Sequence, residues 1–261
     1  MRGWASLYAL SLRLGARSLL RDGPNRQALI RLLVPLDPSR YLELPDTLEQ
    51  LDAAPGERVL DLASPKLPAV ALARRGVTVT SVDALESEVD TWRRLAGHEP
   101  NVTFAMGDGR ALNLPDARFD RAYSISVIEH IAGDGDRTAL SELARVVKPG
   151  GRLVVTLPYA ERYHEDWRPE PVYGDQEAVN GRYFFERWYD EAHVAGLVAS
   201  EPALELTARR VSRLWPNWHR AFIRLFPWLI VLGPFYGLLA LQREGPPGDV
   251  IRLTFTKRGV T

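Results

Sequence analysis

Hydrophobic positions in the middle of the chain occur as short apolar runs, separated by segments in which they recur with a helical period. The runs have the length of strands and cover residues 58–63, 77–83, 101–105, 119–126 and 152–157. The helical segments end at glycines or at a Pro-Gly pair and cover residues 67–75, 84–96 and 134–147. Strands that alternate with helices pair in parallel through right-handed crossovers, so the pattern predicts a doubly wound α/β sheet.

The chain before this alternation has a helical pattern. Residues 1–33 follow a helical period that places Arg13, Arg17 and Arg21 on one face. Prolines then interrupt the chain, and a short helix is predicted over residues 47–53. We therefore predict a helical N-terminal extension over residues 1–54 and one α/β domain over residues 55–261.

The chain after Pro158 is less regular. We expect a loop or lid, then a helix, then two final strands that bring the total to seven. These elements cover residues 159–180, 182–195, 204–211 and 250–257. Between the last two strands the chain is rich in apolar and aromatic residues, which predicts a hydrophobic helical insertion over residues 212–248.

Composition and charge limit the classes of function. The 261 residues have a formal net charge of zero, so nothing in the bulk charge attracts nucleic acid. Residues 1–40 carry seven Arg against two Asp, a local charge of +5. The chain has no cysteine, which excludes disulfides and thiolate chemistry and fits a cytoplasmic protein. No spacing of His, Asp and Glu resembles a metal site.

Carboxylates lie at the carboxyl ends of three consecutive predicted strands. They are Asp61, Asp83, which comes 22 residues later, and Asp108, which precedes Gly109. Doubly wound sheets bind ligands at the carboxyl ends of their strands. Asp83 is suited to accept both hydroxyls of a ribose, and Asp108 is suited to accept from the amine of an adenine. Asp61 would repel a pyrophosphate but would favour a nucleoside that carries an ammonium or sulfonium group.

Residues 57–157 resemble a class I S-adenosylmethionine-dependent methyltransferase, of the kind that includes ubiquinone and menaquinone methyltransferases. The matching stretches are "VLDLASPK", "VTSVDA", "GDGRALNLPDARFD", "SISVIEHI" and "LARVVKPGGRLVVTLP". Each is weak alone, but five in this order are specific. The resemblance implies a Rossmann-like sheet of seven strands, in which strands 204–211 and 250–257 form an antiparallel hairpin at the edge.

The resemblance also implies S-adenosylmethionine as the cofactor and assigns residues to its parts. Residues Ala63, Ser64 and Lys66 of the loop, with Asp61, would approach the methionine part. The ribose would lie at Asp83 and Ala84, and the adenine near Asp108 and Gly109. Ser126 and Val127 would lie near the sulfur.

The loop after the first strand departs from the family pattern of acid-x-Gly-x-Gly. Ala63 and Pro65 occupy the glycine positions. A positive φ at Ala63 would cost roughly 1–2 kcal/mol, and Pro65 has no N–H to donate. We expect Ser64 to cap the following helix and Lys66 to bind the carboxylate of the cofactor. On that interpretation this is an alternative cofactor loop; the other interpretation is a degenerate loop that binds nothing.

Two residues are candidates for catalysis. Methyl transfer needs an aligned acceptor and, for a hydroxyl, a base. His130 follows the fourth strand and is the candidate base. The other interpretation is that it packs on or caps the following segment, or only shapes the pocket. Tyr159 begins the segment that would line the acceptor pocket or its lid, with a solvated loop as the other interpretation.

These expectations define a function and its alternatives. The predicted function is methyl transfer from S-adenosylmethionine to a small, apolar or lipid-like acceptor. The alternative is a catalytically decayed module that acts by binding a partner or a membrane. A dehydrogenase-like nucleotide fold ranks last, because the glycine fingerprint is missing and Asp61 is unfavourable.

The apolar segment 215–242 leaves two interpretations open. Its prolines would break a helix. Both its ends return to the same edge of the sheet, so a single crossing of a membrane is impossible. It is either an insertion packed over the acceptor pocket or an interfacial patch at a membrane. In the second case the basic residues 1–33 would lie beside it, and the cytoplasmic protein would be membrane-associated.

Overall fold

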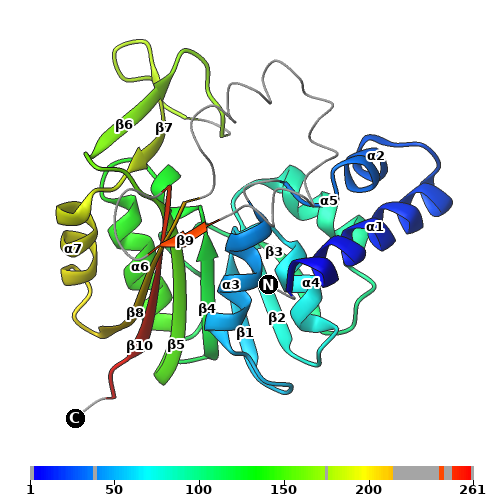
Figure 1. Ribbon diagram of the computed structural model, residues 1–261, viewed down its shortest axis with the longest axis horizontal. Helices are drawn as coiled ribbons and strands as arrows, with labels where there is room; N and C mark the ends of the chain where they lie inside the picture. The colour runs from blue at the N-terminus through cyan, green and yellow to red at the C-terminus, as the bar shows by residue number, and fades with distance from the viewer. Residues whose placement is uncertain (1–2, 38–39, 174–175, 214–240, 244–248, 260–261) are drawn as a thin grey trace.

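The computed structural model describes residues 3–37, 40–173, 176–213, 241–243 and 249–259 (Figure 1). Its centre is one sheet in the order β3-β2-β1-β4-β5-β10-β8-β9. The strands are β1 (Arg58–Leu62), β2 (Thr78–Asp83), β3 (Val102–Met106), β4 (Phe119–Ile125), β5 (Val147–Pro158), β8 (Leu204–Arg213), β9 (Leu241–Arg243) and β10 (Val250–Lys257). Strands β1 to β5 are parallel, and β10 runs antiparallel to both β5 and β8. The predicted doubly wound sheet and its terminal hairpin are therefore confirmed.

Helices cover both faces of the sheet (Figure 1). They are α1 (Gly3–Asp22), α2 (Arg26–Leu33), α3 (Arg40–Leu51), α4 (Leu67–Ala73), α5 (Glu86–Ala96), α6 (Gly135–Val146) and α7 (Glu191–Ala199). Successive strand residues point to opposite faces, so Val59 joins the core under α1, α3, α4 and α5, while Leu60 joins the core under α6 and α7. Both side chains are fully buried.

The N-terminal segment shares a core with the sheet. Leu7 and Leu14 of α1 and Tyr41 of α3 are at most 2% exposed and belong to the same apolar cluster as Val59 and Val79. A buried ion pair also joins α3 to the sheet, because Arg252 of β10 lies 2.5 Å from Asp46. The proposed domain boundary at residue 54 stays a prediction.

Two helix predictions in this segment were wrong at their ends. The helix expected over residues 1–33 stops at Asp22, where Gly23 takes φ +72°, and α2 restarts after Asn25, whose side chain accepts from the Ala28 amide. The helix expected over 47–53 begins at Arg40 and contains Pro45. Burial of apolar side chains from α3 outweighs the hydrogen bond that this proline removes.

Local patterns were also misread after β5. The expected loop 159–180 contains β6 (His164–Arg168), and the expected helix 182–195 begins as β7 (Tyr183–Trp188), with which β6 pairs. Aromatic residues favour strands when they pack across a pair; Trp167 lies edge-on to Phe184 across this ribbon. Helix α7 starts only after Asp190, whose side chain accepts from the His193 amide.

The predicted insertion falls mostly outside the described residues. Residues 212 and 213 belong to β8, and Leu241–Arg243 form β9, so these parts are strand rather than helix. The eighth strand β9 pairs with the sheet edge at β8. Residues 214–240 and 244–248 lie outside the described part of the chain.

Candidate functional site

Asp61 and Asp83 lie side by side at the carboxyl edge of the sheet because β1 and β2 are parallel neighbours. Asp61 is fully buried and accepts from the Ser81 hydroxyl at 2.7 Å and from the Ser64 amide at 3.2 Å. Burial raises the pKa of Asp61, against the opposing effect of nearby Lys66. Two buried carboxylates at one edge require a compensating charge.

Lys66 supplies that charge. Its ammonium nitrogen Nζ lies 2.8 Å from Asp83 Oδ2 and 3.8 Å from Asp61 Oδ2, and it donates to the Ser64 carbonyl at 2.8 Å. The side chain is only 2% exposed. We expected Lys66 to bind the carboxylate of the cofactor, but the structure turns it inward to neutralise the two aspartates.

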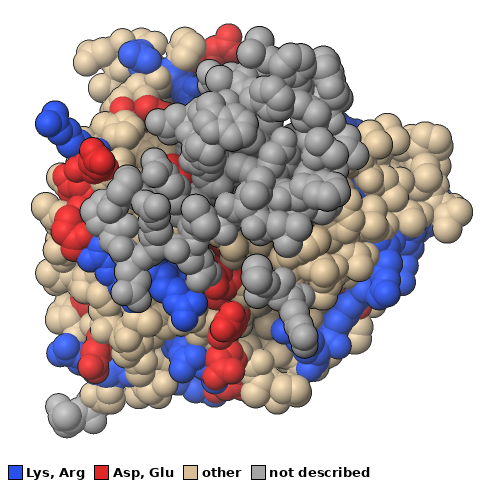
Figure 2. All heavy atoms as spheres, viewed as in Figure 1, with Lys and Arg blue, Asp and Glu red and all other residues tan. Residues whose placement is uncertain are grey.

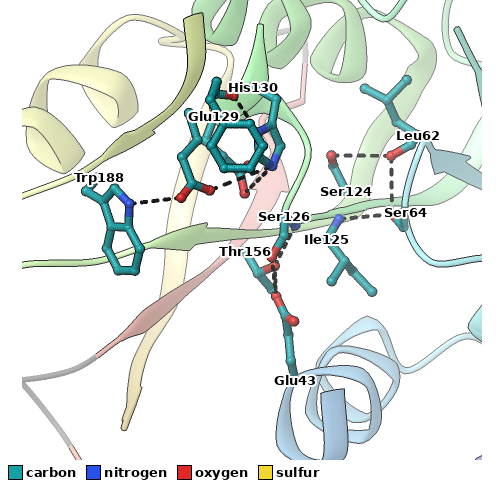
Figure 3. A network of polar contacts seen from close by, with 12 residues as sticks. Glu43, Leu62, Ser64, Ser124, Ile125, Ser126, Glu129, His130, Thr156 and Trp188 are labelled. Atoms are coloured by element: carbon teal, nitrogen blue, oxygen red, sulfur yellow. Dashed lines mark hydrogen bonds and ion pairs between the residues drawn. The ribbon is translucent and has the colours of Figure 1, made fainter. Parts of the chain in front are cut away.

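The loop from Ala63 to Lys66 takes the strained form that the sequence suggested. Ala63 has φ +50°, the left-handed region that glycine favours. The predicted cap by Ser64 is wrong, because Lys66 is the N-cap of α4 and no side chain caps that helix. Ser64 Oγ instead donates to the Leu62 carbonyl and accepts from the Ile125 amide at 2.9 Å (Figure 3). It thereby fastens the loop to β4.

The residues that follow β2 and β3 are more exposed than Asp61. Asp83 Oδ1 accepts from the Leu85 amide at 3.0 Å, and Ala84 beside it is exposed. The Asp108 side chain is 45% exposed and forms an ion pair with Arg110, whose guanidinium lowers the pKa of that carboxyl. Gly109 packs against Leu62, where a Cβ would lie 3.1 Å from a methyl carbon.

Ser126 follows β4 and forms hydrogen bonds with both members of an ion pair on α3. The sequence did not predict these contacts. Ser126 has φ +51°, and its hydroxyl donates to Glu43 Oε1 at 2.8 Å (Figure 3). The same hydroxyl accepts from Arg40 Nη1 at 3.0 Å. Arg40 and Glu43 are ion-paired, and Thr156 of β5 also donates to Glu43. Val127 continues the chain in an irregular conformation. No local signal marks Arg40 and Glu43, because a proline-rich stretch conceals the start of α3.

His130 lies in the short 3₁₀ turn after Val127, beside the buried Glu129 (Figure 3). Its Nδ1 is 2.7 Å from the Phe185 carbonyl, which only accepts, so Nδ1 carries the proton and Nε2 holds a lone pair. Nε2 lies 3.7 Å from Glu129 Oε1 and 3.9 Å from Glu186 Oε2. Burial lowers the pKa of His130, so its imidazole is neutral at pH 7.

Glu129 is fully buried, and neither of its carboxyl oxygens has a hydrogen-bond partner. Burial raises the pKa of Glu129 well above its usual value, which favours the protonated form of this carboxyl. Arg40 and Glu43 are close enough to influence this pKa. The structure therefore brings Ser126 and His130 together with three groups that the sequence did not single out: Arg40, Glu43 and Glu129.

Tyr159 belongs to a different set of contacts. Its ring is 1% exposed, and its hydroxyl donates to Glu191 of α7 at 2.9 Å. Arg209 of β8 donates to the same hydroxyl. These contacts turn the phenol hydroxyl toward α7 and β8.

Two further features concern the described residues only. No group of three or more His, Asp or Glu among them is placed to hold a metal ion. None of the helices in this part of the chain combines the length and apolar character needed to cross a bilayer.

Comparison with known proteins identifies the domain. A family described as "Methyltransferase domain" matches residues 60–155. The demethylmenaquinone methyltransferase of Beutenbergia cavernae is 42% identical over 135 residues, which cover 49% of this chain and 50% of the relative. Residues 60–155 form a class I S-adenosylmethionine-dependent methyltransferase domain.

Another relative agrees with this assignment, and a solved structure shares the fold. The demethylmenaquinone methyltransferase of Corynebacterium efficiens is 38% identical over 42% of this chain and 45% of its own length. This methyltransferase-domain chain thus spans half or less of the length of these two relatives. The 1,6-didemethyltoxoflavin-N1-methyltransferase of Burkholderia thailandensis has the same fold, with a TM-score of 0.55 and 19% identity over 97% of this chain and 89% of its own.

The predicted resemblance is confirmed, and S-adenosylmethionine is the cofactor that it implies. The matches give no support to a decayed, non-catalytic module. The methyltransferase domain fits the nucleoside half of this cofactor. A carboxylate accepts about four hydrogen bonds, and among the described residues Asp83 accepts from the Leu85 amide and pairs with Lys66. It therefore retains capacity for ribose hydroxyls, whereas the roles of the individual site residues stay predictions.

Proposed function

We propose that this protein transfers the methyl group of S-adenosylmethionine to a small, apolar acceptor with a quinone-like ring. The observation that carries the proposal is the row of carboxylates at the ends of three neighbouring strands: Asp61, Asp83 and Asp108. The row lies within a methyltransferase domain, and the buried Lys66 ammonium lies 2.8 Å from Asp83 and 3.8 Å from Asp61. Relatives named demethylmenaquinone methyltransferases support the acceptor class.

The residues after β4 suit an acceptor that must lose a proton. When bound, the cofactor supplies an electrophilic methyl group. The Nε2 lone pair of neutral His130 is available to take a proton from an acceptor hydroxyl or acidic carbon. Glu186, 3.9 Å away, would stabilise the resulting imidazolium.

Isothermal titration tests the cofactor assignment. We expect both S-adenosylmethionine and S-adenosylhomocysteine to bind with a dissociation constant on the order of 1–100 μM, about −5 to −8 kcal/mol. NAD should not bind, because Asp61 disfavours a pyrophosphate at this edge. A folded protein that binds NAD, or neither of the first two compounds, would contradict the proposal. Candidate acceptors would then be assayed by methyl transfer from labelled S-adenosylmethionine.

We also propose that α1 and α2 contact an anionic membrane surface. Leu20 is 88% exposed, and Leu33 is 59% exposed. Lys and Arg atoms gather along the flank of the molecule beside α1 (Figure 2). Exposed apolar side chains beside basic ones suit an interfacial helix, and each basic residue near an anionic surface contributes about 1 kcal/mol. The predicted contact through residues 215–242 lies almost wholly outside the described residues.

Sedimentation with lipid vesicles tests this contact. The protein should sediment with vesicles that contain phosphatidylserine and remain in solution with neutral ones. A Leu20→Glu, Leu33→Glu double variant should lose the association. Val172→Glu is the matched control, because Val172 is also exposed but lies near the β6–β7 ribbon. Equal sedimentation of wild type and double variant would exclude α1 and α2 as the contact.

A further inference from the structure

The cofactor loop leaves little to bind the amino-acid end of S-adenosylmethionine. The Ala63 amide donates to the Val82 carbonyl at 2.7 Å, and the Ser64 amide donates to Asp61. Pro65 has no N–H. The ammonium of Lys66 is bound to Asp83 and is 2% exposed. The cofactor carries a carboxylate at this end, and a carboxylate that leaves water needs donors or a positive charge.

Arg40 is a cation that lines a pocket next to the loop 63–66. An open pocket of about 360 Å³ is lined by Arg40 together with Pro65 and Leu67. The charged residues that line the pocket are Arg31, Asp37 and Arg40, so its net charge is +1. Arg40 reaches from this pocket to Ser126, and its side chain is 26% exposed. A pocket of about 490 Å³ between α1, α2 and α5 does not adjoin the loop.

Glu43 holds Arg40 in this position. Both contacts of Arg40 with Glu43 and Ser126 use Nη1 alone. A guanidinium has five N–H donors arranged as a fork. Glu43 is itself fixed by Ser126 and Thr156 and is 1% exposed. The guanidinium is thus oriented before any ligand arrives, which lowers the entropic cost of binding.

We propose that Arg40 of α3 binds the amino-acid carboxylate of the cofactor, in place of the backbone donors that a glycine-rich loop provides. Glu43 is a positioning residue for Arg40 in this arrangement. The N-terminal segment is then part of the cofactor site. The inference rests on the proposed function, because it assumes that S-adenosylmethionine binds at this edge of the sheet.

Two ligands that differ only at the end in question test the inference. S-adenosylhomocysteine carries the amino-acid group, whereas 5′-methylthioadenosine has a methyl group in its place. Titration of Arg40→Gln with both should show about a 10- to 100-fold loss of affinity for S-adenosylhomocysteine, as expected for a lost charge-assisted hydrogen bond. Affinity for 5′-methylthioadenosine should be unchanged. Arg26→Gln is the matched control, because Arg26 lines the other pocket, which does not adjoin the loop, and it should alter neither affinity.

The double variant Arg40→Gln, Glu43→Gln is the control for loss of stability, because it removes both charges of the pair and leaves neither unpaired. It should show the same selective loss, with a melting temperature near that of the wild type. Unchanged affinity for S-adenosylhomocysteine in the folded variants, or an equal loss for both ligands, would overturn the role of Arg40. A wild-type protein that binds neither ligand would overturn the proposed function as well, so the two failures are distinguishable.

Discussion

Replacing His130 by glutamine should lower kcat by about 10²–10⁴-fold, the usual contribution of a general base. Glutamine can still donate to the Phe185 carbonyl but offers no basic lone pair where Nε2 lies. Affinity for S-adenosylhomocysteine should remain near that of the wild type, because the proton transfer concerns the acceptor alone. The measurement is a methyl-transfer assay with the identified acceptor, alongside titration with S-adenosylhomocysteine.

The pH profile separates a base from a residue that only shapes the pocket. Burial lowers the pKa of His130 from its usual value near 6.5. The base form therefore persists below pH 6.5, and the acidic limb of kcat/KM should fall below that pH. The limb should disappear in His130→Gln. His98→Gln is the control, because the side chain of His98 is 43% exposed and near α5, and it should behave as wild type. A His130→Gln variant with normal kcat would assign His130 a packing role.

Replacing Lys66 by methionine should destabilise the protein by about 3–5 kcal/mol, the cost of removing one partner from a buried ion pair. Methionine keeps the length and apolar stem of lysine, so the loss is mainly of charge. Asp61 and Asp83 would then remain as neighbouring carboxylates, 0% and 5% exposed, without a cation. Urea denaturation measures the change in the free energy of unfolding.

The destabilisation should depend on pH with a definite sign. Without Lys66, burial and mutual repulsion raise at least one carboxyl pKa of the pair above its unfolded value of about 3.9. Stability from such a group is fully present below the unfolded pKa and is lost as pH rises through the folded pKa. The deficit of Lys66→Met should therefore be larger at pH 8 than at pH 5.

Lys148→Met is the control for this experiment. Lys148 also pairs with an aspartate, Asp120, but its side chain is 42% exposed. Exposed pairs contribute about 0–1 kcal/mol. If Lys66→Met were no more damaging than Lys148→Met, or its deficit did not depend on pH, Lys66 would not be the counter-charge of the two aspartates.

The strands of residues 58–157 were readable from the sequence because each strand is a local feature. Apolar runs of strand length separated by amphipathic segments recur through residues 58–157, and all five runs are strands of the sheet. The errors occurred where local pattern and tertiary packing disagree. The aromatic residues 183–188 were assigned to a helix, but they pair with β6 and stack across the ribbon. Pro45 was taken as a break, but α3 continues through it while burying Tyr41 and Leu44.

In the candidate site, too, some features followed from the sequence and others only from the tertiary structure. The positions of Asp61, Asp83 and Asp108 followed from the sequence, because parallel strands joined by right-handed crossovers bring their carboxyl ends to one edge. The positive φ of Ala63 followed from its place in the glycine pattern. The partner of each charge was decided only by the tertiary structure. Lys66 turned inward to Asp83, and Arg40 reached Ser126 across 86 positions of sequence. Burial sets which charges must pair, and burial is a property of the packed molecule that no local stretch of sequence contains.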